Sequence, residues 1–174
     1  IVQSLVGSEM CIRDRYKDPI YALPAHWAPN DLLFYTGNMF PERYRNGVFI
    51  AFHGSTNRTP YPQAGYIVGF IPFKNRIPSG KLEIFADGFS QLDLIKDVKD
   101  VKYRPMGLAQ GPDGSLYISD SKKGKIWRVL YTDDKSAFTN ENLKNMQLRE
   151  YLPHIRNPIE FVDLINWCQK SSLF

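Results

Sequence analysis

Short apolar runs alternate with turn-forming residues through the second half of the chain. Three such runs lie at residues 107–110, 116–119 and 126–131, separated by Pro112-Asp113-Gly114 and Lys122-Lys123-Gly124. Runs of this length bounded by Gly, Pro and Asp predict β-strands. The Asp-Gly pair favours a type I′ hairpin turn, in which both central residues need a positive φ. The pattern therefore predicts a three-stranded antiparallel meander.

A similar pattern earlier in the chain predicts one more sheet. Residues 47–53 (GVFIAFH) are apolar on both faces, which is typical of a strand that is covered from both sides. A longer polar connection at residues 93–103 separates this sheet from the meander. The expected strands of the first sheet lie at residues 32–35, 47–53, 66–73 and 81–85.

Successive four-stranded meanders are the repeating unit, or blade, of a β-propeller. A blade takes about 40–50 residues, and a propeller closes with about four to eight blades. Residues 16–132 suffice for about two blades, and an open stack would expose apolar faces and strand edges. We therefore expect an all-β fold, a partial β-propeller of about two four-stranded antiparallel blades. On this interpretation the chain is the C-terminal part of a larger propeller.

The two ends of the chain differ from the strand-rich middle. Residues 1–15 contain SEMCIRDR, which resembles translated sequencing-library adapter, and we interpret this segment as a non-native leader. A native amphipathic leader is the alternative. Residues 133–174 are expected to form a short helical tail or linker. One helix is predicted from Thr139 or Asn140 to Leu152, and a second begins at Asn157, with Pro158 at its first position.

Composition narrows the classes of function. The chain has 174 residues and a net charge of +4, and its Lys and Arg residues are scattered rather than gathered in a stripe. This distribution argues against a nucleic-acid partner. No apolar run approaches the roughly 18 residues of a membrane span. The two cysteines, Cys11 and Cys168, lack the spacing of metal ligands.

Four motifs carry a resemblance to a known family. They read PAHWAP, FYTGNMFP, FIAFHGSTNR and RPMGLAQGPDGSLYISDSKKGKIWRV, and together they span residues 21–131. The combination resembles the soluble quinoprotein sugar dehydrogenases, the glucose/sorbosone dehydrogenase family that uses pyrroloquinoline quinone (PQQ). Two positions depart from the family pattern. Thr56 stands where members usually have Trp, and Met106 stands where the glucose-type enzymes have a second Arg.

The resemblance implies a β-propeller that transfers a hydride from a sugar to PQQ. It also implies a calcium ion beside the quinone, a possible cytochrome c as electron acceptor, and a periplasmic or secreted location. The family's general-base histidine and calcium-binding loop belong to earlier blades. We therefore expect no catalytic residue and no metal ligand in this chain, and we expect the fragment alone to be inactive.

Cofactor contacts are expected from residues that can hold the carboxylates of PQQ. Arg104 precedes a predicted inner strand, and by position it resembles a cofactor-binding arginine of the family. His53, Asn57 and Arg58 end a strand and open a loop, where propellers place site residues. A salt bridge at the rim is the alternative role for Arg104, and a structural hydrogen bond is the alternative for His53.

The substrate entrance is expected in the proline-pinned loop that contains Tyr21, His26 and Trp27. Packing within the loop is the alternative role for these three side chains. Asp113 and Asp120 are better explained by turn and strand-end hydrogen bonds than by metal binding. Two alternatives remain for the whole chain: a non-catalytic propeller that serves as a binding module, and a lactonase-like hydrolase propeller with a metal at its axis.

Overall fold

The computed structural model describes residues 19–132, 134–135, 139 and 141. The predicted leader at residues 1–15 and almost all of the expected helical tail lie outside this set. Within it the chain is all-β, as predicted, and the helix whose bounds the structure describes is a 3-10 turn at Glu42–Tyr44. In the described part of the chain no helix is long and apolar enough to cross a membrane.

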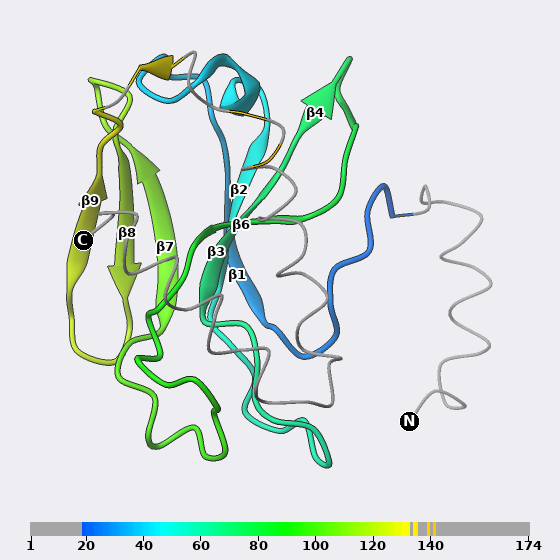
Figure 1. Cartoon of the computed structure of the whole chain (residues 1–174), viewed down its shortest axis with the longest axis vertical. Helices are drawn as coiled ribbons and strands as arrows, with labels where there is room; N and C mark the ends of the chain where they lie inside the picture. Colours follow the sequence, from blue (N-terminus) through cyan, green and yellow to red (C-terminus); the bar gives the residue numbers. More distant parts are fainter. Residues whose placement is uncertain (1–18, 133, 136–138, 140, 142–174) are drawn as a thin grey trace, which may run out of the picture.

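The described strands form three antiparallel sheets, of which the two larger ones match the two predicted groups (Figure 1). The first has the order β1-β2-β3-β6. Its strands are β1 (Pro29–Phe34), β2 (Val48–Phe52), β3 (Ile67–Ile71) and β6 (Glu83–Ala86). The second has the order β7-β8-β9, with β7 (Pro105–Gln110), β8 (Leu116–Asp120) and β9 (Ile126–Val129). The sheets formed by the described residues do not close into a ring, so the partial propeller stays a prediction.

The turn between β7 and β8 is not the predicted type I′ turn. Of its residues only Gly114 has a positive φ, of 85°. The N–H of Gly114 donates to the carbonyl of Gly111 at 2.9 Å, and the N–H of Gly111 donates to the carbonyl of Ser115 at 2.8 Å. Pro112 sets φ for a turn that is closed by a left-handed glycine, the usual form of a three-residue hairpin loop. Pro112 thus lengthens the loop by one residue.

A two-residue hairpin with positive φ at both central positions does occur, at a place that was not predicted. It joins β4 (Phe73–Lys74) to β5 (Ile77–Pro78), and Lys74 pairs with Ile77. Its central residues Asn75 and Arg76 have φ values of 52° and 67°. The sequence gives little sign of this turn, because Arg rarely takes a left-handed conformation.

The two sheets enclose a shared core. In β2 all five residues are buried, and their side chains alternate between two apolar clusters. Phe49 faces the cluster between the sheets, where it meets Leu116 and Ile118 of β8. Val48, Ile50 and Phe52 face a second cluster on the opposite side of the first sheet. The expected burial of this strand on both faces is therefore confirmed.

Polar groups tie the inner strands of the two sheets together. The carboxylate of Asp31 in β1 accepts a hydrogen bond from the N–H of Leu108 in β7 at 2.7 Å. The buried Tyr35 hydroxyl donates to the Gly114 carbonyl at 2.7 Å and accepts from the N–H of Met39 at 3.1 Å. It also accepts from Phe40 N–H at 3.3 Å. Tyr35 therefore links the end of β1 to the β7–β8 turn.

The Tyr35 hydroxyl is expected to stabilise the packing of the two sheets. Tyr35→Phe keeps the ring but removes a hydroxyl that serves the buried Gly114 carbonyl and two N–H groups. Leaving such groups without a partner costs about 1–3 kcal/mol, so we expect a lower free energy of unfolding by that amount. Chemical denaturation measures it. Tyr61→Phe is the control, because Tyr61 is 62% exposed. Equal stability of the two variants would contradict the role of Tyr35.

Candidate functional site

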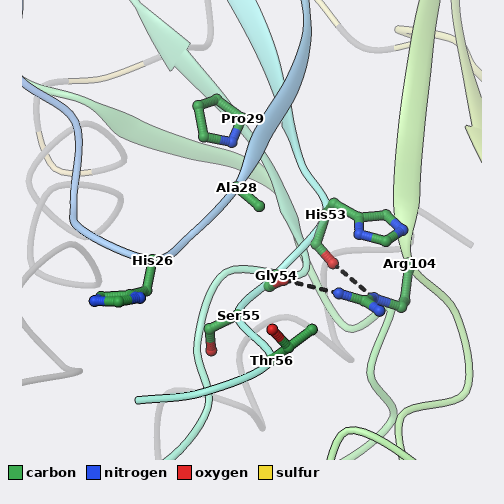
Figure 2. Close-up of a pocket in the computed structure, with 8 residues that line it drawn as sticks. All are labelled: His26, Ala28, Pro29, His53, Gly54, Ser55, Thr56 and Arg104. Atoms are coloured by element: carbon green, nitrogen blue, oxygen red, sulfur yellow. Dashed lines mark hydrogen bonds between the residues drawn. The ribbon is translucent and has the colours of Figure 1, made fainter. Parts of the chain in front are cut away.

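A pocket lies where β1 and β7 begin and β2 ends. Its volume is about 430 Å³, and Figure 2 shows the side chains around it. The lining residues are His26, Ala28, Pro29, His53, Gly54, Ser55, Thr56 and Arg104. The structure thus brings together three of the predicted site residues, His26, His53 and Arg104, although 78 positions separate the first from the last in the sequence.

Arg104 uses one side of its guanidinium to hold the loop after β2. Its Nε donates to the carbonyl of His53 at 3.0 Å, and one Nη2 hydrogen donates to the carbonyl of Gly54 at 2.8 Å (Figure 2). No group among the described residues accepts a hydrogen bond from its Nη1. Arg carries five N–H donors, and these two bonds use only the Nε–H and one Nη2 hydrogen. The other edge, formed by Nη1 and the second Nη2 hydrogen, stays available to an anion. The predicted alternative, a salt bridge at the rim, is not formed within the described residues.

The main chain of Arg104 is fixed by the end of β8. Its N–H donates to Oδ1 of Asp120 at 2.6 Å, and its carbonyl accepts from the N–H of Ser121 at 3.1 Å. Burial of the Asp120 carboxyl raises its pKa, but hydrogen bonds from surrounding backbone N–H groups outweigh burial and bring the pKa below its usual value. Asp120 therefore stays ionised, and its structural role at a strand end agrees with the prediction.

His53 pairs with a residue from the other sheet. Its Nε2 lies 2.7 Å from Oγ of Ser121. Burial and the positive charge of Arg104 lower the pKa of His53, while Asp120 opposes this effect. The imidazole is therefore neutral at neutral pH, with one ring nitrogen as donor and the other as acceptor. The hydrogen bond to Ser121 agrees with the predicted alternative, a hydrogen-bonded histidine at a strand end. A contact between His53 and the cofactor stays a prediction.

Positive φ values at His26 and Ala28, of 66° and 53°, turn the chain sharply around Trp27. His26 is exposed and faces the pocket, whereas Trp27 is 3% exposed and packs edge-on against Phe52. Tyr21 also packs on the cluster around Trp27, and its hydroxyl accepts from the N–H of Leu82 at 2.5 Å. Of the three residues expected at the substrate entrance, only His26 lines the pocket.

Asn57 and Arg58 lie beyond the pocket. The side-chain oxygen of Asn57 accepts from the N–H of Thr59 at 3.4 Å, and Nη1 of Arg58 donates to the carbonyl of Pro62 at 3.1 Å. Both side chains thus contact their own loop, and their contact with a cofactor stays a prediction. Thr56, at the position where the family has Trp, is exposed and lines the pocket.

Two residues beside the pocket were not predicted from the sequence. Tyr66 lies under the guanidinium of Arg104, with its ring centroid 5.6 Å from Cζ, and Ser121 pairs with His53. The position of Ser121 could have been predicted from the sequence. An antiparallel pairing of residues 105–110 with 116–120 places the end of the second strand, where Ser121 follows, beside the start of the first, which Arg104 precedes. Tyr66 follows Gly65 at the start of a strand and has no comparable signal.

The chemistry of the site favours binding of an anion. Arg104 supplies a permanent positive charge, and a bidentate edge of its guanidinium suits a carboxylate. In the described part of the chain, no group of three or more His, Cys, Asp or Glu residues lies close enough together to hold a metal ion. Asp113, the other carboxylate considered, accepts hydrogen bonds from Ser115 and pairs with Arg128.

Arg104 is expected to control the protonation of His53. Because its charge contributes to the lowered pKa of His53, Arg104→Gln should raise that pKa toward the ordinary value of 6.5. NMR titration of the imidazole carbon-bound protons measures the shift. Arg76→Gln, in the β4–β5 hairpin, removes the same charge elsewhere and should leave the pKa of His53 unchanged. A pKa that does not respond to Arg104→Gln would contradict the electrostatic coupling.

Comparison with known proteins identifies the family. A family model described as TrAA12-like matches residues 3–132. An uncharacterized protein of Borreliella burgdorferi is 37% identical over 113 residues, which cover 64% of this chain and 28% of that protein. A pyrroloquinoline quinone-dependent pyranose dehydrogenase of Coprinopsis cinerea is 30% identical over 124 residues, which cover 64% of this chain and 16% of the enzyme.

Solved structures give related matches. A calcium structure of Trichoderma reesei Carbohydrate-Active Enzymes Family AA12 aligns with a TM-score of 0.47 and 25% identity, covering 68% of this chain and 27% of that one. A glucose dehydrogenase structure aligns with a TM-score of 0.45 and 20% identity, covering 67% and 29%. The chain thus spans less than a third of the length of these relatives. Because the family model matches well over half of its residues, the chain belongs to the TrAA12-like family, and the predicted kinship with PQQ-dependent dehydrogenases is confirmed.

Proposed function

We propose that this chain forms part of the PQQ-binding face of a sugar dehydrogenase. The observation that carries the proposal is the guanidinium edge of Arg104, which lines a pocket and has no acceptor among the described residues. Membership of the TrAA12-like family and the similarity to a PQQ-dependent pyranose dehydrogenase support it. On this proposal the Arg104 edge binds one carboxylate of the quinone.

The residues around the pocket fit such a cofactor. A volume of about 430 Å³ lies within the range of roughly 300–1,000 Å³ that is common for small-molecule sites. Arg104 is preorganised, because its Nε and one Nη2 hydrogen are already bound to backbone carbonyls. A carboxylate that meets a fixed guanidinium loses less affinity to side-chain ordering than one that must arrange a free arginine. Met106 carries no charge, so the second arginine of glucose-type enzymes has no counterpart at that position.

Neutral His53 is proposed as a second contact to the cofactor. Its ring lines the pocket beside Arg104 and is held by Ser121, so it can offer or accept a hydrogen bond without adding a charge. His26 is proposed to border the sugar entrance on another wall of the same pocket. For Asn57 and Arg58 we propose cofactor contact only after the outer part of the loop, residues 56–62, adjusts, since both side chains now bind their own loop. Tyr21 and Trp27 would support the loop at the entrance by packing in the apolar cluster of the core.

The complete reaction requires groups beyond this chain. When bound, PQQ supplies an acceptor for the hydride that leaves the sugar. The residues described here would bind and orient the cofactor, whereas the general base and the calcium ligands are expected in segments upstream. We propose that the chain is the C-terminal part of such an enzyme, of sorbosone or glucose type, with a periplasmic or secreted location and a cytochrome c as a candidate acceptor.

Arg104→Ala in the complete product of the gene that encodes this chain tests the proposal. Removing one partner of a partly buried charge pair costs about 2–5 kcal/mol, so PQQ affinity should fall at least about tenfold. Arg104→Lys should recover only part of it, because a point charge cannot replace the bidentate edge. The measurement is a titration of the apoprotein with PQQ in the presence of calcium, followed by dye reduction at saturating sugar.

The matched control is Lys123→Ala, which removes an exposed positive charge and should leave the affinity unchanged. The KM for sugar should change less than the affinity for PQQ in Arg104→Ala. Unaltered PQQ affinity in that variant, with a folded protein by circular dichroism, would assign Arg104 a purely structural role.

A further inference from the structure

The loop that follows β2 presents three consecutive backbone carbonyls to two side chains. Arg104 binds the carbonyls of His53 and Gly54. The hydroxyl of Tyr66 donates a short hydrogen bond to the third, that of Ser55. We propose that Tyr66 is a positioning residue that sets the orientation of the Arg104 guanidinium for anion binding. This inference rests on the proposed role of Arg104 and extends it to a residue outside the pocket lining.

The ring of Tyr66 forms a platform for Arg104. Its centroid lies 5.6 Å from Cζ of the guanidinium, within the range of a cation–π contact. The ring is only 1% exposed and Arg104 is half-buried, so the contact is shielded from water on the side of the ring. The platform restricts the plane of the guanidinium, while the two carbonyls restrict its rotation within that plane.

The hydroxyl of Tyr66 holds the loop that Arg104 binds. Burial raises the pKa of Tyr66, so the hydroxyl stays protonated and donates to Ser55 at neutral pH. The Ser55 side chain is fixed in turn, since its Oγ donates to Oε1 of Gln63 at 2.7 Å and accepts from the N–H of Ala64 at 2.8 Å. The carbonyls that receive Arg104 therefore belong to a segment with little freedom to turn.

Gly54 allows the close approach that this arrangement requires. It has a φ of +89°, and a Cβ at this position would lie 2.4 Å from the ring of Tyr66. A side chain would therefore displace either the ring or the loop. The glycine places the backbone directly against Tyr66, which brings the carbonyls of His53 and Gly54 and the ring to the same guanidinium.

Tyr66 is absent from the pocket lining, so it acts on a bound anion through a residue that lines the pocket, and we assign this role to Arg104. A double-mutant cycle with Arg104 therefore distinguishes a positioning residue from a residue that contacts the cofactor directly. Tyr66→Phe keeps the aromatic ring and removes the hydrogen bond to the Ser55 carbonyl, whereas Tyr66→Leu removes both the ring and the hydrogen bond. We expect the first to weaken PQQ binding about threefold to tenfold, the usual effect of one lost hydrogen bond, and the second to weaken it further.

In the Arg104→Ala background both Tyr66 substitutions should change PQQ affinity less than about twofold, because the coupling partner is gone. Tyr44→Phe is the matched control. Tyr44 is another buried tyrosine, 5% exposed, which packs between Phe49 and Phe70 away from the pocket. It should leave PQQ affinity unchanged. All variants are compared in the complete gene product, with PQQ as the probe.

A second measurement follows Arg104 without the cofactor. In protein labelled with ¹⁵N-arginine, the Nε–H signal of Arg104 is assigned by its loss in Arg104→Ala. Its hydrogen bond to His53 should slow exchange with water, and both Tyr66 variants should speed that exchange, whereas Tyr44→Phe should not. Unchanged exchange in Tyr66→Leu, or an equal loss of PQQ affinity with and without Arg104, overturns the inference. Unchanged PQQ affinity in Arg104→Ala overturns the proposed function instead, and the exchange measurement still decides whether Tyr66 positions Arg104.

Discussion

The hydrogen bonds from Arg104 to the carbonyls of His53 and Gly54 are the constraint on which the site depends. They connect the start of β7 to the end of β2, so they join the two sheets at the mouth of the pocket. A half-buried guanidinium is stabilised by such partners, because burying a polar group without a hydrogen bond is costly. Backbone carbonyls supply them without neutralising the charge. Arg104 therefore serves the fold and keeps its positive charge for a ligand.

The opposite end of the sheet pair is joined by a neutral contact. There the Tyr35 hydroxyl reaches the Gly114 carbonyl, and the apolar cluster around Phe49 fills the space between the two ends. The core thus sets the distance between the sheets, and Tyr35 and Arg104 set their alignment. The pocket lies at the Arg104 end, where the guanidinium is part of its lining.

Features that depend on the local order of apolar and turn-forming residues were predictable from the sequence. Short apolar runs bounded by turn residues located all seven strands of the two larger sheets, and the start of β7 at Pro105 placed Arg104 at a strand end, as expected. Contacts between distant residues were not predictable in this way. The pairing of His53 with Ser121 and the platform under Arg104 depend on how two sheets meet, which one sequence does not encode as a motif. The prediction of a type I′ turn between β7 and β8 was wrong, because Pro112 changes the length of the loop.

The central claim is that one guanidinium holds the loop with one edge and binds a carboxylate with the other. A crystal structure of the complete gene product with bound PQQ tests it most directly. The account predicts a quinone carboxylate within hydrogen-bonding distance of Nη1 of Arg104, while Nε still donates to the carbonyl of His53. A complex in which PQQ occupies another face, or in which Arg104 leaves the loop to reach the cofactor, would contradict it.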